Sequence, residues 1–588
     1  MQTPGYRRSR PSRIRPSTEA SPTWPAGPED LGSVYSVRIS SATELENLES
    51  NVSQGDVVRV EQPETPYRIS SWIDLNTDDV TVAFESAYAA NGGRMVKISD
   101  GANVGGIRVG SSSATKNVTV RGYGHDGNPN NQDGSAKRLH GVLVEDADNV
   151  VIEGCDIYRT SPYSEHGSGG SGITVRHGAG DVWIAENYIE DIGDRGIQVA
   201  GDNILIRGNI GLDGFDRTIS FNVNEPDGNS YIARNVACIA NYGRDNSDGS
   251  IIGSAGGSQN TDRGYFAIIE NVGEGAMRRL ITLRTDERAT VIAGNVGVNG
   301  GGDAAPGINV GQSSPDFAHV IANNVLRGYE RQGILANTTN VTVNGNIIED
   351  CGEAGIENTG VGCTIQSNIV SGYGGIGIDS QAGESATVGN IVRDNDKQGI
   401  RLRSVASRAV TIGNTVHRNS QDSSTNVAEI LVEDSEHLVG LNQITRDGSS
   451  AIAEAGGADK NLYVRNRGDD TIVNMFLIKG AHSWGYANFP ALFDDEGTVT
   501  LTGAGSPAAR IDGVSSTEGM WPEVIVQPDP ASTQPDADYS WDSYVEWDNS
   551  AGAWDAVVEW RTDPGSGNDV SALYEVARNP TSRGIKNG

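Results

Sequence analysis

The sequence predicts an all-β chain organised around a parallel β-helix. Asn324, Asn346, Asn368 and Asn390 lie 22 residues apart, and Asn414 follows after 24. Each repeat holds short apolar segments that alternate as strands do, separated by Gly, Asn and Asp. Nothing in the repeats is long or periodic enough for a helix. Because a short fixed period is typical of stacked units that bury their apolar sides on each other, each repeat is expected to form one coil of three strands and three turns.

The recurring asparagine is expected to form a column along the rod. Asn tolerates the left-handed backbone of a tight turn. Stacked coils would place successive amides ~4.8 Å apart, close enough to bond along the column. Polar inserts from Ser161 to Gly170 and from Asn241 to Arg263 account for the longer intervals, and such corner loops often carry function. The expected column continues through Asn295, Asn271, Asn235, Asn209 and Asn187, with Asp156 replacing Asn before them, and through Asn442 and Asn466 downstream.

These repeats resemble the right-handed parallel β-helix proteins, a group that includes pectin-degrading enzymes and viral tailspikes. The resemblance covers about Val34 to Asn466. It implies the fold but leaves function open, because lyases, hydrolases and binding proteins share this architecture. The sequence motifs associated with polygalacturonases, an Asn-Thr-Asp strand end and a Gly-His-Gly turn, are missing, which weakens the analogy to pectinases.

The chain is expected to divide into four parts. Residues 1–33 form a basic, Pro-rich arm, interpreted either as a disordered tail or as a segment that orders on an acidic partner such as a virion component. Residues 34–468 form the β-helix. Its start carries a capping box, Ser41 to Glu44, which opens a short helix to about Ser50 and shields the first coil's open strand edges.

Residues 469–530 are expected to form a capping β region, and residues 531–588 a C-terminal β domain. Alternation and aromatic residues predict a hairpin from Tyr544–Trp547 and Ala556–Trp560. Two roles remain open for this part of the chain: capping with oligomer contact, or a carbohydrate-binding platform.

The composition is strongly acidic, and this narrows the classes of partner that the protein is expected to bind. Asp and Glu number 77 against 45 Lys and Arg, for a formal net charge of −32, and lysine is scarce. This pattern favours a protein from a high-salt environment over an ordinary acidic protein. It argues against a nucleic-acid partner. The 4 cysteines lack metal-ligand spacing and imply no disulfide framework, and no cofactor is expected.

Export signals are not apparent in the sequence. No apolar run predicts membrane insertion, and the first residues lack the apolar core of a signal peptide. The protein is therefore expected to act inside the cell, to be cut from a longer precursor, or to leave by lysis as part of a virion.

Candidate catalytic residues repeat along the Asn column. Asp191 and Asp194-Arg195 follow Asn187 at the same offsets as Asp213 and Asp216-Arg217 follow Asn209. In register, the carboxylates of neighbouring coils would lie about 5 Å apart, which suits a retaining glycoside hydrolase. Arg195 and Arg217 could hold an acidic sugar. A corner ladder of Asp and Arg without chemistry is the alternative, because Asp is a favoured turn residue and Asp350 and Asp394 recur at the same offset.

A second candidate is the cationic cluster of Arg278, Arg279 and Arg284. It is expected either to bind an anionic glycan or to form a solvated face of salt bridges.

Two functions are compatible with these features. The first is a virion spike or fibre of a haloarchaeal virus that attaches to other virion proteins through its N-terminal arm and binds host-surface polysaccharide or glycoprotein. Such spikes are homotrimers by resemblance, and the protein would be found on the virion or outside the lysed cell. The second is a polysaccharide hydrolase or lyase that uses the stacked carboxylates.

Overall fold

The computed structural model describes most of the β-helix and the strands of the C-terminal part. The described residues are 35–133, 139–160, 170–214, 216–224, 229–244, 249–254, 265–275, 278–283, 289–300, 305–311, 318–372, 374–403, 408–419, 428–445, 450–455, 461–464, 466–468 and the strands named below from 476 to 579. The expected N-terminal arm lies outside the described residues.

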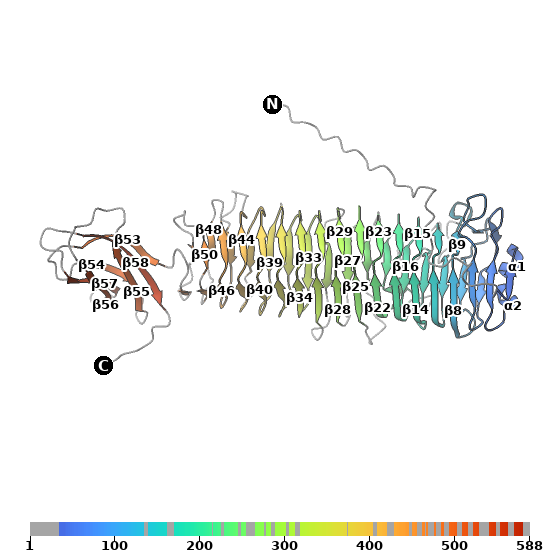
Figure 1. The fold of residues 1–588 in the computed structure, drawn as a ribbon, viewed down its shortest axis with the longest axis horizontal. Helices are drawn as coiled ribbons and strands as arrows, with labels where there is room; N and C mark the ends of the chain where they lie inside the picture. The colour runs from blue at the N-terminus through green and yellow to red at the C-terminus, as the bar shows by residue number, and fades with distance from the viewer. Residues whose placement is uncertain are drawn as a thin grey trace, which may run out of the picture.

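Three parallel sheets wind around a common axis and form a rod, as Figure 1 shows. Each coil contributes one strand to each sheet, and each strand pairs with its counterpart in the next coil. Sheet A contains β1 (Val37–Ile39), β2 (Val57–Val60), β5 (Thr81–Phe84), β8 (Thr115–Arg121), β11 (Ala147–Glu153), β14 (Gly180–Ala185), β17 (Asp202–Arg207), β22 (Arg234–Ile239), β25 (Phe266–Ile269), β28 (Thr290–Ala293), β31 (His319–Ala322), β34 (Val341–Asn344), β37 (Thr364–Gln366), β40 (Ala386–Val388), β43 (Val410–Ile412), β46 (Leu438–Gly440), β49 (Leu462–Val464) and β52 (Trp484–Tyr486).

Sheet B follows sheet A across the Asn corner of each coil. It contains β3 (Tyr67–Ile69), β6 (Val96–Ile98), β9 (Gly124–Asp126), β12 (Asp156–Tyr158), β15 (Tyr188–Glu190), β18 (Ile210–Leu212), β23 (Tyr242–Arg244), β26 (Val272–Glu274), β29 (Val296–Val298), β32 (Val325–Arg327), β35 (Ile347–Glu349), β38 (Ile369–Ser371), β41 (Ile391–Arg393), β44 (Thr415–His417), β47 (Gln443–Thr445) and β50 (Arg467–Gly468).

Sheet C closes the coil. It contains β4 (Ile73–Leu75), β7 (Ile107–Val109), β10 (Val142–Val144), β13 (Ile173–Val175), β16 (Arg195–Val199), β19 (Arg217–Ser220), β24 (Ser250–Gly253), β27 (Arg279–Leu283), β30 (Ile308–Gly311), β33 (Gln332–Asn337), β36 (Ala354–Asn358), β39 (Ile376–Ser380), β42 (Ile400–Leu402), β45 (Ala428–Val432), β48 (Ser450–Glu454) and β51 (Phe476–Leu477). A short hairpin, β20 (Asn222–Asn224) and β21 (Ser230–Ile232), and a 3-10 turn, Pro129–Asn131, lie outside the three sheets.

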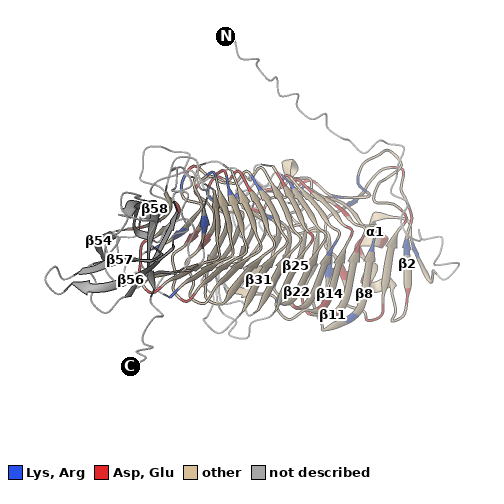
Figure 2. Cartoon of the chain, turned by 60° about the vertical axis from the view of Figure 1, so that its left-hand side comes forward, with Lys and Arg blue, Asp and Glu red and all other residues tan. Residues whose placement is uncertain are grey.

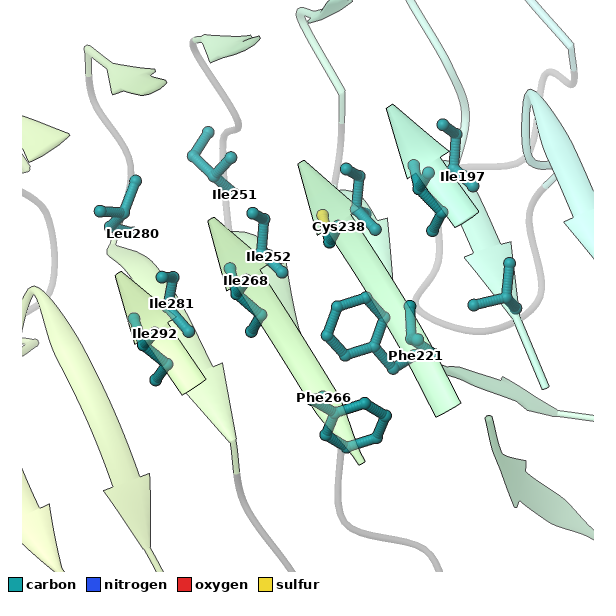
Figure 3. Close-up of a cluster of buried hydrophobic side chains, with 14 of the residues drawn as sticks. Ile197, Phe221, Cys238, Ile251, Ile252, Phe266, Ile268, Leu280, Ile281 and Ile292 are labelled. Atoms are coloured by element: carbon teal, nitrogen blue, oxygen red, sulfur yellow. The ribbon is translucent and has the colours of Figure 1, made fainter. Parts of the chain in front are cut away.

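The core is a stack of aliphatic side chains from all three sheets. Ile268 of β25 is in register with Ile292 of β28, and both are fully buried. Figure 3 shows these residues with Phe221 and Phe266, whose ring centroids are 5.0 Å apart. Because alternate residues of a strand face opposite sides, only the inward half of each strand needs to be apolar.

The Asn column is present and its amides are bonded as predicted. The Asn346 Oδ1 accepts from both the backbone N and the side-chain Nδ2 of Asn324, each at 2.9 Å. The Asn346 Nδ2 donates to the Asn368 Oδ1 and to the Ile321 carbonyl, also at 2.9 Å. These buried amides therefore satisfy one another and the backbone at the same corner, from Asn187 to Asn466.

Two predicted members of the column are wrong. Asn241, not Asn235, follows Asn209, because its Oδ1 accepts from the Asn209 backbone N at 3.0 Å. Asn235 instead bonds Asn203 at an exposed corner on the other end of the sheet A strand. Before Asn187 the position belongs to Cys155, whose N–H donates to the Asn187 Oδ1 at 2.9 Å, and Asp156 is the first residue of β12.

The left-handed backbone at this corner belongs to the residue before each column asparagine from Asn187 to Asn442, so the prediction that Asn itself adopts it is wrong. Glu186, Ser367 and Leu441 have φ of 56°, 55° and 55°. Glycine fills the same position in other coils, as at Gly345 with φ of 66°. The chain turns one residue early, and this leaves the Asn side chain directed inward along the column.

The N-terminal end of the rod carries two short helices, α1 (Ala42–Glu46) and α2 (Leu48–Asn51). The Ser41 Oγ accepts from the Glu44 N at 3.2 Å, and the Glu44 carboxylate accepts from the Ser40 N at 2.8 Å. Leu45 and Leu48 are fully buried. These contacts fix the helices where Figure 1 shows them, at one end of the stacked coils.

The C-terminal strands form two antiparallel sheets. One contains β53 (Phe493–Leu501), β55 (Trp521–Pro528) and β58 (Val570–Asn579), and the other contains β54 (Ala509–Ser515), β56 (Ser540–Asp548) and β57 (Ala553–Thr562). The predicted hairpin is present as β56 and β57, with Trp547 opposite Trp554. The expected division between residues 530 and 531 runs through both sheets, because β53 and β55 pair with β58 in one sheet and β54 pairs with β57 in the other.

Candidate functional site

Asp191 and Asp213 lie at the corner that follows sheet B. Both have left-handed backbone, with φ of 56° and 53°, and Asp350 and Asp394 have φ of 57° at the equivalent corner. The Asp191 N–H donates to the carbonyl of Leu212 in the next coil at 3.2 Å. The corner-ladder alternative accounts for these two aspartates, because Asp is one of the few residues that adopt this conformation readily.

Asp194, Asp216, Arg195 and Arg217 form a buried ionic cluster at the start of sheet C. Arg195 and Arg217 are paired in register on β16 and β19. The Asp216 Oδ2 accepts from the Arg195 Nε and from the Arg217 Nη1, both at 3.1 Å. The Asp194 Oδ1 lies 3.9 Å from the Arg195 Nε. Asp194 is 0% and Asp216 3% exposed. These two predicted residues therefore lie beside the same Arg195 side chain, in a place closed to solvent.

The ionic cluster continues as a chain of buried hydrogen bonds across the outside of sheet C. The Arg195 Nη1 donates to the Gln198 Oε1 at 3.0 Å, and the Gln198 Nε2 donates to the Ser171 Oγ at 2.6 Å. Thr174 then contacts the His140 Nδ1 at 2.9 Å. A buried network in which each charge has a partner holds neighbouring coils in one arrangement. A catalytic role for these residues remains a prediction.

The predicted arginine cluster is only partly described. Arg278 and Arg279 are half-buried; Arg279 pairs with Ser250 as part of β27, and the Arg278 N–H donates to the Gly249 carbonyl at 3.2 Å. Arg284 lies outside the described residues.

A different group of side chains, missed by the sequence predictions, gathers on the outer face of sheet B. We call Tyr88, Arg94, Asp156, Tyr158, Tyr188 and Glu190 the Tyr–Arg cluster. The Arg94 Nε and Nη2 each lie 3.0 Å from the Asp156 Oδ1, and Nη2 lies 3.7 Å from the Glu190 Oε2. The Tyr88 hydroxyl donates to the Asp156 Oδ2. The guanidinium of Arg94 lies 4.3 Å from the ring centroid of Tyr158, a cation–π contact.

The loop that supplies Tyr88 and Arg94 crosses a whole coil. Tyr88 pairs with Arg94 as an isolated antiparallel bridge between β5 and β6, and the side chains reach β12 and β15 beyond β9. Gly124 makes this possible, because a Cβ there would lie 1.7 Å from the Ala87 carbonyl oxygen. The loop therefore packs directly against the backbone of β9 at Gly124.

Two tyrosines of the cluster, Tyr88 and Tyr188, keep their hydroxyl protons at physiological pH. Burial and the hydrogen bond to Asp156 raise the pKa of Tyr88 well above its ordinary value. Burial, together with the charges of Glu190 and Asp156, raises the pKa of Tyr188 to about 12. The cluster thus brings together aromatic rings, hydroxyl groups, the Arg94 guanidinium and two carboxylates from three of four successive coils, and the Arg159 guanidinium also lies 4.3 Å from the Tyr158 ring centroid. This combination suits a polyhydroxylated ligand, which offers apolar C–H faces and many hydroxyl groups.

A signal for this group did exist in the sequence. Once coils are aligned, the first residue after the column position faces outward, and Asp156 and Tyr188 stand there in successive coils. The insert from Ser86 to Arg94, with its Asn-Gly-Gly turn, marks the extra loop. The mistaken placement of Asp156 in the column concealed both.

Sheet C carries a second pair of in-register carboxylates. Glu357 of β36 pairs with Asp379 of β39. The Arg403 Nε donates to the Asp379 Oδ1 at 2.9 Å, and the Gln381 Nε2 donates to the Glu357 Oε1 at 2.8 Å. Glu357 is partly exposed, in contrast to Asp194 and Asp216.

Metal and membrane features are absent from the described part of the chain. No cluster of three or more His, Cys, Asp or Glu side chains there could hold a metal ion. Among the same residues, no helix has the length and apolar character needed to cross a membrane.

Comparison with known proteins supports the fold. Residues 281–467 match the family described as "Right handed beta helix region", so the rod is a right-handed parallel β-helix. No curated protein sequence matches the chain.

Solved structures with a similar course of the chain come from several proteins. A tailspike protein of E. coli bacteriophage HK620 in complex with pentasaccharide is 12% identical, with 92% of this chain and 94% of that chain covered and a TM-score of 0.42. An alginate lyase from Paenibacillus sp. is 14% identical, with 53% and 94% covered and a TM-score of 0.31. The A-module of the Azotobacter vinelandii mannuronan C-5 epimerase AlgE4 is 17% identical, with 74% and 91% covered and a TM-score of 0.23. Likeness at this level concerns the fold and carries no argument about activity.

Proposed function

We propose that this protein is a host-attachment spike of a virion and that its β-helix binds a host-surface polysaccharide at the Tyr–Arg cluster. The observation that supports the proposal is the meeting of Tyr88, Tyr158 and Tyr188 with Arg94 on one outer face. Asp156 accepts hydrogen bonds from Arg94 and from the Tyr88 hydroxyl, and Arg94 lies over the Tyr158 ring. Rigid aromatic and arginine side chains provide most of the binding energy at recognition sites, because they bury large areas at little cost in entropy.

The charge of the chain supports a host that lives in high salt. A net charge of −32 keeps a protein soluble where salt screens repulsion between its carboxylates. We therefore extend the proposal to a haloarchaeal virus, with residues 1–33 as the segment that contacts other virion proteins and with a homotrimer as the assembled form.

Binding is tested by titrating purified protein with surface polysaccharide from haloarchaeal cells in molar salt. Tyr158→Ala should weaken binding about tenfold, since loss of one stacked ring costs about 1–2 kcal/mol and 1.4 kcal/mol is a factor of ten. Tyr265→Ala is the matched control, because Tyr265 is 60% exposed and precedes β25 of sheet A, away from the cluster. Equal affinities of the two variants would contradict the proposed site. Mass spectrometry of purified virus particles tests the assignment to a spike, and absence of the chain would refute it.

A polysaccharide hydrolase is the second candidate, favoured by Glu357 and Asp379. Their backbones lie one strand spacing apart, ~4.8 Å, which is compatible with the ~5 Å carboxyl separation of retaining enzymes. The test is the release of reducing ends from the same polysaccharide. Glu357→Gln should abolish release if this pair acts. Loss of product only in Asp191→Asn and Asp213→Asn would favour the corner aspartates instead. No product from the unmodified protein would refute the hydrolase.

A further inference from the structure

One side of the rod is devoid of charged outward positions. On sheet A from β25 to β46, two positions per strand face outward, and none is Asp, Glu, Lys or Arg. The first residue of each sheet B strand from β23 to β47 also faces outward and is never charged. We call these positions together the uncharged face. Figure 2 shows its strands β25 and β31 in tan.

The contrast with the rest of the surface is sharp for a chain in which 21% of residues are charged. On the same coils, the outward positions of sheet C include Glu357 and Arg401, and the third positions of sheet B include Glu349 and Arg393. Chance placement would put several charges on the uncharged face. Their absence along one side only indicates a surface that avoids the cost of burying unpaired charge.

The uncharged face is also apolar and exposed. Val291 is 41%, Ile347 37% and Ile391 40% exposed. Val320 and Val325 continue the two rows between them, on sheets A and B. With ~4.8 Å per coil, the face is about 40 Å long, which is larger than the apolar patches that monomers ordinarily expose.

The number of outward positions matches what a stable association needs. Each coil from β25 to β46 contributes two positions on sheet A and one on sheet B. Together they reach the ~20–30 residues a side of a standard protein–protein interface. The face lies over the Asn column, whose buried amides hold the coils at a fixed spacing, so it presents a rigid surface.

The charge of a possible partner decides whether it could occupy the uncharged face. A basic partner, including the Arg-rich segment before residue 34, would pair with carboxylates, and the outward strand positions of this face have none, since Glu270, Glu384 and Glu436 stand only at its corners. A second copy carries the same net charge of −32 and can approach only where both surfaces lack carboxylates. A second copy also repeats the same ~4.8 Å spacing, so ridges of one face fit grooves of the other.

We infer that the uncharged face is the surface through which copies of this chain associate side by side. The inference rests on this face alone and stands whether or not the Tyr–Arg cluster binds a polysaccharide. Apolar association of this kind strengthens in salts that are excluded from protein surfaces. Salt also screens the repulsion between the acidic rods.

The test measures molar mass by light scattering after size exclusion in molar salt. The unmodified protein should have a mass of two or more 62.0 kDa chains. Val320→Arg places a cation at the centre of the face and should lower the mass to that of one chain. Leu335→Arg is the matched control, because Leu335 is an outward, half-buried aliphatic residue of the same coil on sheet C, and this variant should keep the mass of the unmodified protein. Far-UV circular dichroism and thermal unfolding show whether both variants remain folded.

A single-chain mass for the unmodified protein would overturn the inference, whatever else binds the face. An unchanged mass for a folded Val320→Arg variant would also overturn it, because the copies would then associate elsewhere. Should Val320→Arg fail to fold, Ile347→Arg tests the same face from sheet B with the same expected result.

Discussion

Replacing Asn346 with alanine removes the centre of a continuous column of hydrogen bonds. The variant leaves the backbone N–H of Asn324 and one hydrogen of its Nδ2 without an acceptor in a fully buried place. It also removes the donor that the Ile321 carbonyl receives at 2.9 Å. Each unsatisfied buried group costs about 1–3 kcal/mol, so we expect the free energy of unfolding to fall by about 4 kcal/mol.

The matched control for this change is Asn344→Ala. Asn344 is two residues earlier in the same coil, and its side chain faces outward. We expect its loss to change the free energy of unfolding by less than about 0.5 kcal/mol. Urea unfolding followed by circular dichroism measures both variants against the unmodified protein. Similar losses for the two would refute the view that the column stabilises the rod.

A double variant sharpens the test. The Asn346 Nδ2 donates to the Asn368 Oδ1, so the two asparagines share a bond. The losses of Asn346→Ala and Asn368→Ala should therefore sum to more than the loss of the double variant by about 1 kcal/mol. Asn346→Ala with Asn442→Ala should be additive, because these asparagines lie in separate coils with Asn368, Asn390 and Asn414 between them. Additivity of the neighbouring pair would refute coupling along the column.

Three further predictions concern local features. Leu441→Gly should raise the free energy of unfolding by about 1 kcal/mol in urea titration, because Leu441 adopts φ of 55° while its side chain is 56% exposed. Burial lowers the pKa of His125 to about 4, whereas the unfolded chain titrates near ~6.5, so stability is fully present above about pH 6.5. Below that pH the free energy of unfolding should fall by about 1.4 kcal/mol per unit until about pH 4, and His125→Leu should remove this part of the slope in urea titrations at several pH values. Burial raises the pKa of Cys155 and of Cys351 to about 12, and all 4 cysteines are free and buried, so a thiol reagent at pH 8 should modify them only after denaturation. Rapid labelling of the folded protein would contradict that assignment.

The solenoid could be predicted well from the sequence, because the interval between recurring asparagines equals the number of residues in one coil. Where two coils are 22 residues apart, as at Asn346 and Asn368, no other element intervenes and the register is readable. Where loops lengthen the coil, as between Asn209 and Asn241, counting alone selected Asn235, because it lies closer to the usual interval. Spacing could not distinguish the two asparagines, since that depends on which strand each one follows.

The candidate site was less accessible to sequence reasoning. Alignment of the coils correctly placed Asp194 near Asp216 and Arg195 near Arg217, because residues at equivalent positions of successive coils lie side by side when their strands pair in register. It could not reveal that these side chains are buried, since that depends on what covers sheet C. The Tyr–Arg cluster joins Tyr88 to Asp156 across 68 residues, and no periodicity connects an inserted loop with the coil it touches.

The length of the loops and the geometry of the Asn column are independent in this molecule. Asn209 and Asn241 are 32 residues apart and Asn346 and Asn368 are 22 apart, yet in both pairs the side-chain bond measures 2.9 Å. A corner can therefore gain or lose residues while the windings above and below keep their places. Such a rod can acquire new surface loops by insertion, and its outer surface can diverge quickly while its framework stays the same.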